Sequence, residues 1–166
     1  MSNIVKNFQN IRSSINNSNV NIIAVSKTFS FDKIKPLIDF GHSHFGENKV
    51  QEAKEKWIKF RRYNSGLQLH MIGKLQTNKA KDAVKLFDYI HSVDSEKLAI
   101  ALVKYENLFN KRNKYFIQVN LGNEIQKSGI NIQALPKFYS FCKNISLNII
   151  GLMCIPPNNQ NPKKYF

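Results

Sequence analysis

The chain has 166 residues, a size suited to one domain, and 42% of them are hydrophobic, which is enough for a core and argues against disorder. The formal net charge is +14, but the lysines are scattered and no stacking aromatic residues are interleaved with them, so we expect no nucleic-acid partner. No stretch of the sequence approaches the ~20 apolar residues that cross a bilayer, so we expect no membrane segment.

The sequence favours a cytoplasmic protein. Its amino-terminal residues lack the apolar core of a secretory signal, and Cys142 and Cys154 both lie in apolar surroundings, as buried reduced thiols do. His42, His44 and His91 have no carboxylate or cysteine at ligand spacing, so we predict no metal site.

Short apolar runs alternate with amphipathic stretches along the chain. The first stretch predicts a helix whose apolar face carries Ile4, Phe8, Ile11 and Ile15. Six runs rich in Ile, Val, Phe or Tyr follow, each bounded by turn residues, as buried strands are. They cover residues 22–26, 42–46, 67–72, 89–93, 115–121 and 147–153.

Helices are predicted between these runs. Gly41 marks the end of the first crossover helix, and Pro36 inside that helix predicts a kink or a late start. After the fourth run, Asp94 or Ser95 can cap a helix. Two apolar faces are expected: Val50, Ala53, Trp57 and Phe60 in one helix, and Leu98, Ala101, Tyr105 and Leu108 in the other.

A leading helix followed by repeated β-α units predicts a parallel sheet with right-handed crossovers. No Gly-x-Gly-x-x-Gly follows the first run, so a Rossmann site is not expected. A complete eight-fold barrel needs roughly 200–250 residues. We therefore expect an incomplete barrel whose first and sixth strands are open edges, with marginal stability or association through those edges.

Lys27 is the most distinctive candidate for chemistry. It ends the first run, which we expect to be buried on both faces, and by the two-residue period it shares a face with Ile23 and Val25. An amine against apolar walls loses its proton more readily and can attack an aldehyde to form a Schiff base. In the alternative interpretation, Lys27 reaches out of the barrel mouth and pairs with Glu47 or Asp94.

Other candidates follow later strands, where parallel α/β proteins carry their function. His70 could form a wall for a planar ring, or it could be a core histidine satisfied by its neighbours. Gly73 and Lys74 could present an amide and a cation to a phosphate, or could simply make a tight turn. Residues 126–129 could bind an anion or form an ordinary loop.

Six ordered blocks resemble those of the pyridoxal phosphate homeostasis protein family. The blocks are AVSKT at 24–28, FGEN at 45–48 with VQE at 50–52, HMIGKLQTNK at 70–79, HSVDS at 91–95, QVN at 118–120 with QKSG at 126–129, and GLM at 151–153. The resemblance implies the (β/α)8 TIM-barrel fold of the alanine racemase N-terminal domain, with about six of its eight βα units in a single partial domain over residues 1–166.

The same resemblance implies a cofactor and a role. Lys27 is expected to hold pyridoxal 5'-phosphate as a Schiff base, with Asn48 and His70 lining the ring region. The implied role is intracellular homeostasis of vitamin B6 vitamers and amino acids, without established turnover, in relatives that are monomeric at full length. The family's late Ser-Met-Gly-Met-Ser-like and Arg-Ile-Gly-Thr-like blocks, which supply most of its phosphate cradle, do not occur in the 166 residues.

Two other functions remain open at this point. A racemase-like enzyme using the same cofactor needs a second acid or base across the ring, which alanine racemases take as a tyrosine from another domain. The other alternative is a non-functional remnant that no longer binds the cofactor.

Overall fold

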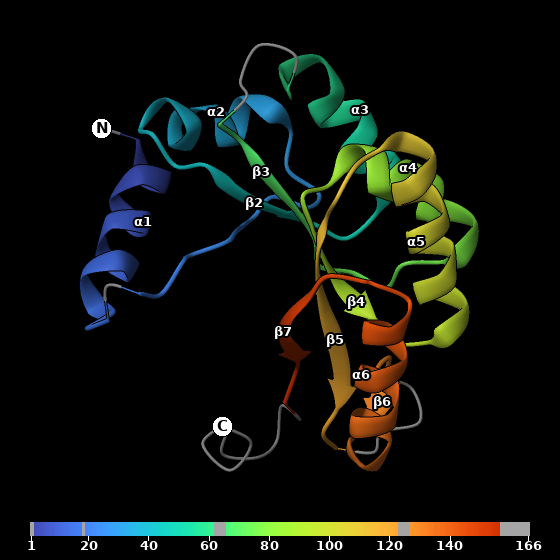
Figure 1. The fold of residues 1–166 in the computed structure, drawn as a ribbon. Coiled ribbons are helices and arrows are strands. Elements are labelled where there is room, and N and C mark those ends of the chain that lie inside the picture. Colours follow the sequence, from blue (N-terminus) through green and yellow to red (C-terminus); the bar gives the residue numbers. More distant parts are fainter. Residues whose placement is uncertain (1, 18, 62–65, 123–126, 157–166) are drawn as a thin grey trace.

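The computed structural model describes residues 2–17, 19–61, 66–122 and 127–156 (Figure 1). These residues form one parallel sheet with helices along its outer side. The strands are β1 (Ala24–Val25), β2 (His44–Glu47), β3 (Gln68–Met71), β4 (Tyr89–Val93), β5 (Lys114–Asn120), β6 (Ile130–Asn131) and β7 (Ile149–Cys154). The α-helices are α1 (Asn3–Ser14), α2 (Phe31–Asp39), α3 (Val50–Arg61), α4 (Ala80–Leu86), α5 (Glu96–Phe109) and α6 (Leu135–Asn144).

Strands β1 to β5 pair in chain order, and every described pairing is parallel. This confirms the predicted barrel-type topology. The short strand β6 was not predicted, because two residues are too few to show a pattern. Strand β6 pairs with the end of β5 along one edge of β5, and β7 pairs with β5 along the opposite edge. Val119 of β5 is therefore opposite Ile130 on one side and Cys154 on the other. In the described part of the chain, β1 and β7 each have a single partner strand.

The core lies between the outer face of the sheet and the helices. Phe45, Leu69 and Ile90 alternate along their strands with inward-facing residues and are completely buried. Trp57 of α3 packs against Phe45 with ring centroids 5.1 Å apart, as the predicted apolar face of α3 requires. The helix after β4 begins as expected, because the Ser95 hydroxyl accepts a hydrogen bond from the Leu98 amide.

The first crossover helix ends where the sequence predicted. Gly41 has φ +95°, a conformation that glycine adopts at little cost, and its amide donates to the Ile38 carbonyl. The helix begins at Phe31, five residues before Pro36, so the late start that Pro36 suggested is not found.

The predicted burial of the first run is wrong. Val25 is 49% exposed and Lys27 is also exposed. The physical reason is the position of β1 at the edge of the sheet, where β2 is its one partner among the described strands. Strand β2 therefore covers β1 from one side, and the apolar side chains of the first run are partly exposed to solvent.

Two predicted helix faces are correct only in part, since Phe8 and Leu98 are buried and Ala101 and Tyr105 pack against the core, but Ile11 and Leu108 are exposed. In α1 the buried residues are Val5 and Phe8, while Ile11 is 54% exposed, because the ring contacts of α1 with Phe40 and His42 are made by Phe8. In α5 the buried face carries Leu98, Ala99, Leu102 and Glu106, and Leu108 is 63% exposed. Glu106 turns inward because its carboxylate accepts the Asn113 amide at 2.6 Å.

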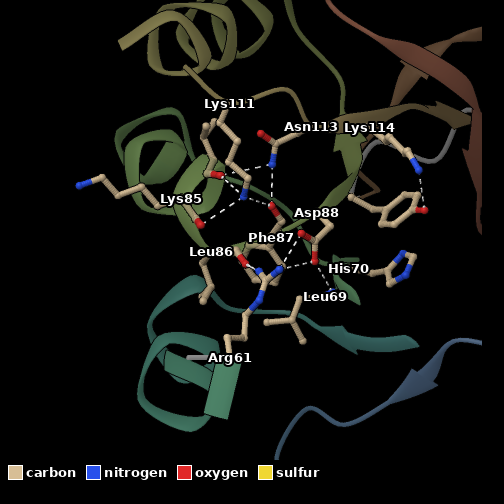
Figure 2. A network of polar contacts seen from close by, with 12 residues as sticks. Arg61, Leu69, His70, Lys85, Leu86, Phe87, Asp88, Lys111, Asn113 and Lys114 are labelled. Carbon is tan, nitrogen blue, oxygen red and sulfur yellow. Dashed lines mark hydrogen bonds and ion pairs between the residues drawn. The ribbon is translucent and has the colours of Figure 1, made fainter. Parts of the chain in front are cut away.

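A polar network holds the amino ends of the strands (Figure 2). Asp88, just before β4, accepts hydrogen bonds from the Arg61 guanidinium at 2.7 and 2.8 Å and from the Leu69 amide at 2.8 Å. Arg61 also donates to the Leu86 carbonyl. The network therefore connects the last residue of α3 to the end of α4 and to β3.

Lys111 caps the end of α4 in the same network. Its ammonium donates to the carbonyls of Val84 at 2.8 Å and Phe87 at 2.7 Å, which lie in and just after the last turn of the helix. A cation suits this position because the carbonyls there lack intrahelical partners. Burial lowers the pKa of Lys111, the charge of Asp88 opposes that shift, and Arg61 adds to it.

No helix among the described residues has the length and apolar character needed to cross a bilayer.

We predict that Asp88→Asn destabilises the chain by about 2 kcal/mol, because it weakens the charge-assisted hydrogen bonds from Arg61 and Leu69. Urea unfolding followed by circular dichroism measures this free energy. Asp82→Asn is the matched control, because Asp82 is 3.7 Å from Lys54 in an exposed pair and should cost less than about 1 kcal/mol. Equal losses in the two variants would contradict the structural role of Asp88.

Candidate functional site

The carboxyl ends of the parallel strands meet at one edge of the sheet, which is where parallel α/β proteins place their sites. Lys27 follows β1 and Asn48 follows β2. The register pairs Val25 with Gly46, and the Ser26 amide donates to the Gly46 carbonyl at 2.9 Å, so the two strands stay paired up to these positions. Gly73 and Lys74 follow β3 and complete the same edge.

A cavity of roughly 310 Å³ opens at this edge. Its walls combine apolar and polar side chains from the ends of several strands. The lining residues are Asn48, Ile72, Gly73, Lys74, Gln118, Val119, Asn120, Lys127, Ser128 and Ile155. The lining thus combines two lysine ammonium groups, side-chain amides and a hydroxyl with a few aliphatic side chains. Such a lining suits a small anionic molecule that has an apolar part.

Glycine is required at two points, Gly73 in the cavity wall and Gly129 just after it in the loop that carries Lys127 and Ser128. A Cβ on Gly73 would lie 2.3 Å from the Asn48 carbonyl oxygen, so the loops after β2 and β3 can approach only without a side chain there. Gly129 has φ +118°, and a Cβ on it would lie 2.8 Å from the Asn120 amide nitrogen. The tight turn that the sequence suggested at Gly73 as an alternative to phosphate binding is therefore real, and Gly73 also lines the cavity.

The backbone before Lys27 is held by a buried carboxylate. Glu47 is fully buried and accepts hydrogen bonds from the Ser26 hydroxyl at 2.7 Å, the Trp57 indole at 2.9 Å and the Lys56 ammonium at 2.9 Å. Lys56 also donates to the Ser26 carbonyl at 2.7 Å. These bonds join β1, β2 and α3 at a single point.

The turn that carries Lys27 is anchored on its other side as well. Thr28 has φ 65°, an unusual conformation for a β-branched residue, and its amide donates to the Glu52 carboxylate. Lys27 itself is exposed between these two anchored residues. Its backbone is thus fixed while its ammonium reaches solvent at the edge of the site.

The alternative partners suggested for Lys27 are taken by other lysines. Glu47 pairs with Lys56 rather than Lys27. Asp94 has a raised pKa because it is buried, and the neighbouring charge of Lys74, with the Gly129 backbone, opposes that rise. Asp94 and Lys74 therefore form a charged group beside the cavity.

The predicted site residues occupy different places. Asn48 lines the cavity, whereas Lys27 and His70 are not among the described residues that line it. His70 is 4% exposed on the inner face of the sheet, where its two ring nitrogens contact His44 and His91. The loop at 126–129 reaches the cavity through Lys127 and Ser128, while Gln126 lies outside the described residues.

Sequence reasoning missed Lys56, and it placed Gln118 and Asn120 in the QVN block without proposing them as site residues. Gln118 and Asn120 lie near the end of the fifth predicted run, and their alternate spacing puts them on one face of β5, a signal that could have found them. Lys56 directly precedes Trp57 in a lysine-rich helix, and the pattern alone does not distinguish it from Lys54 and Lys59.

The histidines of the inner face are held in their neutral form. Burial lowers the pKa of His70 to about 3, with the charges of His91, His44 and Lys114 adding to the effect. Burial also lowers the pKa of His91 to about 4. At neutral pH both rings therefore carry one proton and offer one donor and one acceptor.

We predict that Glu47→Gln destabilises the chain by roughly 3–5 kcal/mol, because it removes the buried, hydrogen-bonded counter-charge of the Lys56 ammonium and leaves only the more exposed Glu52 carboxylate at 3.6 Å. Urea unfolding measures the loss. The control is Glu55→Gln, which changes an exposed carboxylate on α3, the helix that also carries Lys56. Its effect should be less than about 1 kcal/mol. A double variant, Glu47→Gln with Lys56→Met, should recover part of the stability. Failure of Lys56→Met to recover any would count against the buried pair.

The histidines also predict a dependence on pH. A ring whose folded pKa lies below its unfolded value of about 6.5 binds more protons in the unfolded state, so stability falls as the pH drops from about 6.5 to about 4 for His91 and about 3 for His70. Each histidine adds a slope of up to about 1.4 kcal/mol per pH unit. Unfolding measured between pH 7 and 4 should show a shallower slope for His91→Asn; an unchanged slope would contradict the assignment.

With the fold and site established, comparisons with known proteins are informative. Residues 1–166 match the family described as alanine racemase, N-terminal domain. The pyridoxal phosphate homeostasis protein of Buchnera aphidicola is 41% identical over 140 residues, which are 82% of this chain and 60% of the relative. The protein of the same name from Escherichia coli K12 is 34% identical over 139 residues, again 82% of this chain and 59% of the relative.

Solved structures agree with the fold. PipY of Synechococcus elongatus without pyridoxal phosphate has a TM-score of 0.89 and 34% identity, over 98% of this chain and 75% of PipY. The structure of PipY with pyridoxal phosphate bound gives a TM-score of 0.81, over 98% and 74%. An alanine racemase of Clostridium difficile 630 has a TM-score of 0.75, with 98% of this chain and 43% of the racemase covered; at 15% identity this shows the fold alone.

The chain spans about 60% of the length of the curated relatives it matches. The parallel sheet, the ordered motifs and the match over residues 1–166 lead to one conclusion: this chain belongs to the alanine racemase N-terminal domain family, and the relatives it matches there include pyridoxal phosphate homeostasis proteins.

Proposed function

We propose that this chain binds pyridoxal 5'-phosphate at the carboxyl ends of its strands and holds the aldehyde on Lys27 as a Schiff base. The observation that carries the proposal is the position of Lys27, an exposed lysine in an anchored turn beside a cavity suited to a small anion. The relatives named as pyridoxal phosphate homeostasis proteins and the PipY structure with the cofactor bound support it.

The residues present suit the parts of the cofactor. A lysine amine captures an aldehyde by forming a C=N bond with loss of water. Lys74, Lys127 and the backbone of Gly73 offer cations and an amide to a phosphate. Asn48 can hydrogen-bond a ring substituent, and Ile72 supplies an apolar surface for the ring.

His70 is included in the proposed site because of where its ring lies, and not as a hydrogen-bond partner of the cofactor. Gly46 lies opposite His70 in the paired strands, two residues before Asn48, and the side chains of Ile72 and Ile23 fill the space that a Cβ on Gly46 would occupy. Both nitrogens of His70 already contact other histidines, so we assign it to the wall behind the ring region.

The wider role follows from the relatives. We assign the chain to homeostasis of vitamin B6 vitamers and amino acids in the cytoplasm, as a protein that holds the cofactor without turning over a substrate. The similarity to alanine racemases concerns the fold alone and does not favour an enzyme. Proton exchange at the α-carbon of alanine, measured with added cofactor, should not exceed that of Lys27→Ala; a higher rate would favour the racemase-like alternative.

We predict that Lys27→Ala abolishes covalent capture of the cofactor, because the other lysine described at the end of β1, Lys56, is buried in its ion pair with Glu47 and cannot replace the amine. The protein is incubated with pyridoxal 5'-phosphate, reduced with borohydride, digested and mapped by mass spectrometry. Lys27→Arg should also lose the label, since it keeps the charge but not the nucleophile. Lys33→Ala, which removes an exposed lysine nearby, should retain it. Stoichiometric labelling of Lys27→Ala would overturn the assignment, and absence of any label in the unchanged chain would support the remnant interpretation.

A further inference from the structure

Three histidines from neighbouring strands form a continuous hydrogen-bonded chain on the inner face of the sheet. Nδ1 of His44 in β2 lies 3.0 Å from Nε2 of His70 in β3, and Nδ1 of His70 lies 2.9 Å from Nε2 of His91 in β4. Both distances are those of N–H···N hydrogen bonds. His70 uses both of its ring nitrogens in this chain, which fixes the plane of its imidazole.

Aromatic rings enclose the chain and keep water from it. Tyr89 stacks on His70 with centroids 4.3 Å apart and an interplanar angle of 10°, and Phe116 stacks on His91 at 4.2 Å and 18°. His70 is 4% exposed and His91 8% exposed. The hydrogen bonds between the rings are therefore shielded from competition by solvent.

One end of the chain opens toward solvent. A cavity of roughly 520 Å³ at the amino end of the sheet is lined by His42, His44, Phe8 and Arg12, among others. His42 donates from Nε2 to the His44 carbonyl at 2.8 Å and packs against Phe8. The chain thus begins at an open cavity and ends at His91 inside the sheet.

We propose that His44, His70 and His91 form a proton path from the amino-end cavity to the inner face of the sheet. A neutral imidazole has one N–H and one lone pair, so three linked rings must all point their donors in the same direction. When the donors point from His44 to His91, Nδ1 of His91 carries a proton and is a donor. When they point the other way, Nδ1 of His91 is an acceptor. The path goes beyond cofactor binding, because it gives His70 a second role beside the wall of the ring region and uses His44 and His91, which do not line the carboxyl-end cavity.

Each transfer along the path balances. A proton from water or a buffer acid binds Nε2 of His44, and His44 passes its Nδ1 proton to Nε2 of His70. His70 then passes its Nδ1 proton to Nε2 of His91, and His91, which is 8% exposed, gives its own Nδ1 proton to a water molecule at the inner face of the sheet. One N–H bond forms and one breaks at each ring. After the transfers the N–H donors of the three imidazoles point in the opposite direction, and no ring has gained charge.

The charges around the path favour neutral rings. The Lys114 ammonium of β5 acts on His44 and His70, and Arg12 of α1 acts on His42. Asp88 is the carboxylate that acts on His44 and opposes Lys114. Lys114 is itself held by the Tyr89 hydroxyl at 3.0 Å. A proton held on one of these buried rings is therefore disfavoured.

The test is 15N nuclear magnetic resonance of the whole chain with labelled histidine. We expect scalar couplings across both N–H···N bonds, one tautomer sense for all three rings, and imidazole N–H exchange at His91 that depends on His44. His44→Gln should slow that exchange by about tenfold or more, since protons must then await local opening of the sheet.

Tyr139→Phe is the matched control, because Tyr139 is 47% exposed on α6 and the change should leave the exchange rate at His91 unchanged. His70→Phe is not used, because it could unfold the protein. The couplings in the unchanged protein are enough to test whether the three imidazoles are hydrogen-bonded to one another. Missing couplings, or exchange at His91 that is the same with and without His44, would overturn the proposal.

Discussion

The buried carboxylate of Glu47 is the constraint on which the site depends. It accepts hydrogen bonds from β1, from α3 and from the Lys56 ammonium, and Lys56 in turn holds the carbonyl of Ser26. A charge buried this completely is tolerated only because it is paired and hydrogen-bonded. Its position fixes the end of an edge strand that has a single partner among the described strands, and this is the strand that carries Lys27.

The two ends of the sheet are built for different tasks. At the amino end, Arg61, Asp88 and Lys111 satisfy carbonyls and amides left open at the end of α4 and the start of β3, which is a structural role. At the carboxyl end, glycines and polar side chains leave a cavity instead. The inner face between them is not purely apolar, because His44, His70 and His91 connect neighbouring strands there.

The fold could be predicted because its signals are local. Short apolar runs, the Ser95 cap and Gly41 each act within a few residues, and each predicted run contains or overlaps a strand. Burial was predicted less well, because it depends on distant neighbours: Val25 looked like a core residue, but β1 lies at the sheet edge. The two-residue strand β6 was too short to show any period.

In the site, the sequence singled out Lys27, Asn48 and Gly73 by their positions after strands. It could not assign Lys56 to Glu47, since that choice depends on how α3 is rotated against the sheet. Nor could it link three histidines that are more than twenty residues apart, because their contact depends on strand register.

The most direct test of the central claim is a crystal structure of the chain grown with pyridoxal 5'-phosphate. We predict electron density for the cofactor that is continuous with Nζ of Lys27, at the edge formed by the ends of β1, β2 and β3. Density joined to another lysine, or cofactor bound away from that edge, would contradict the account.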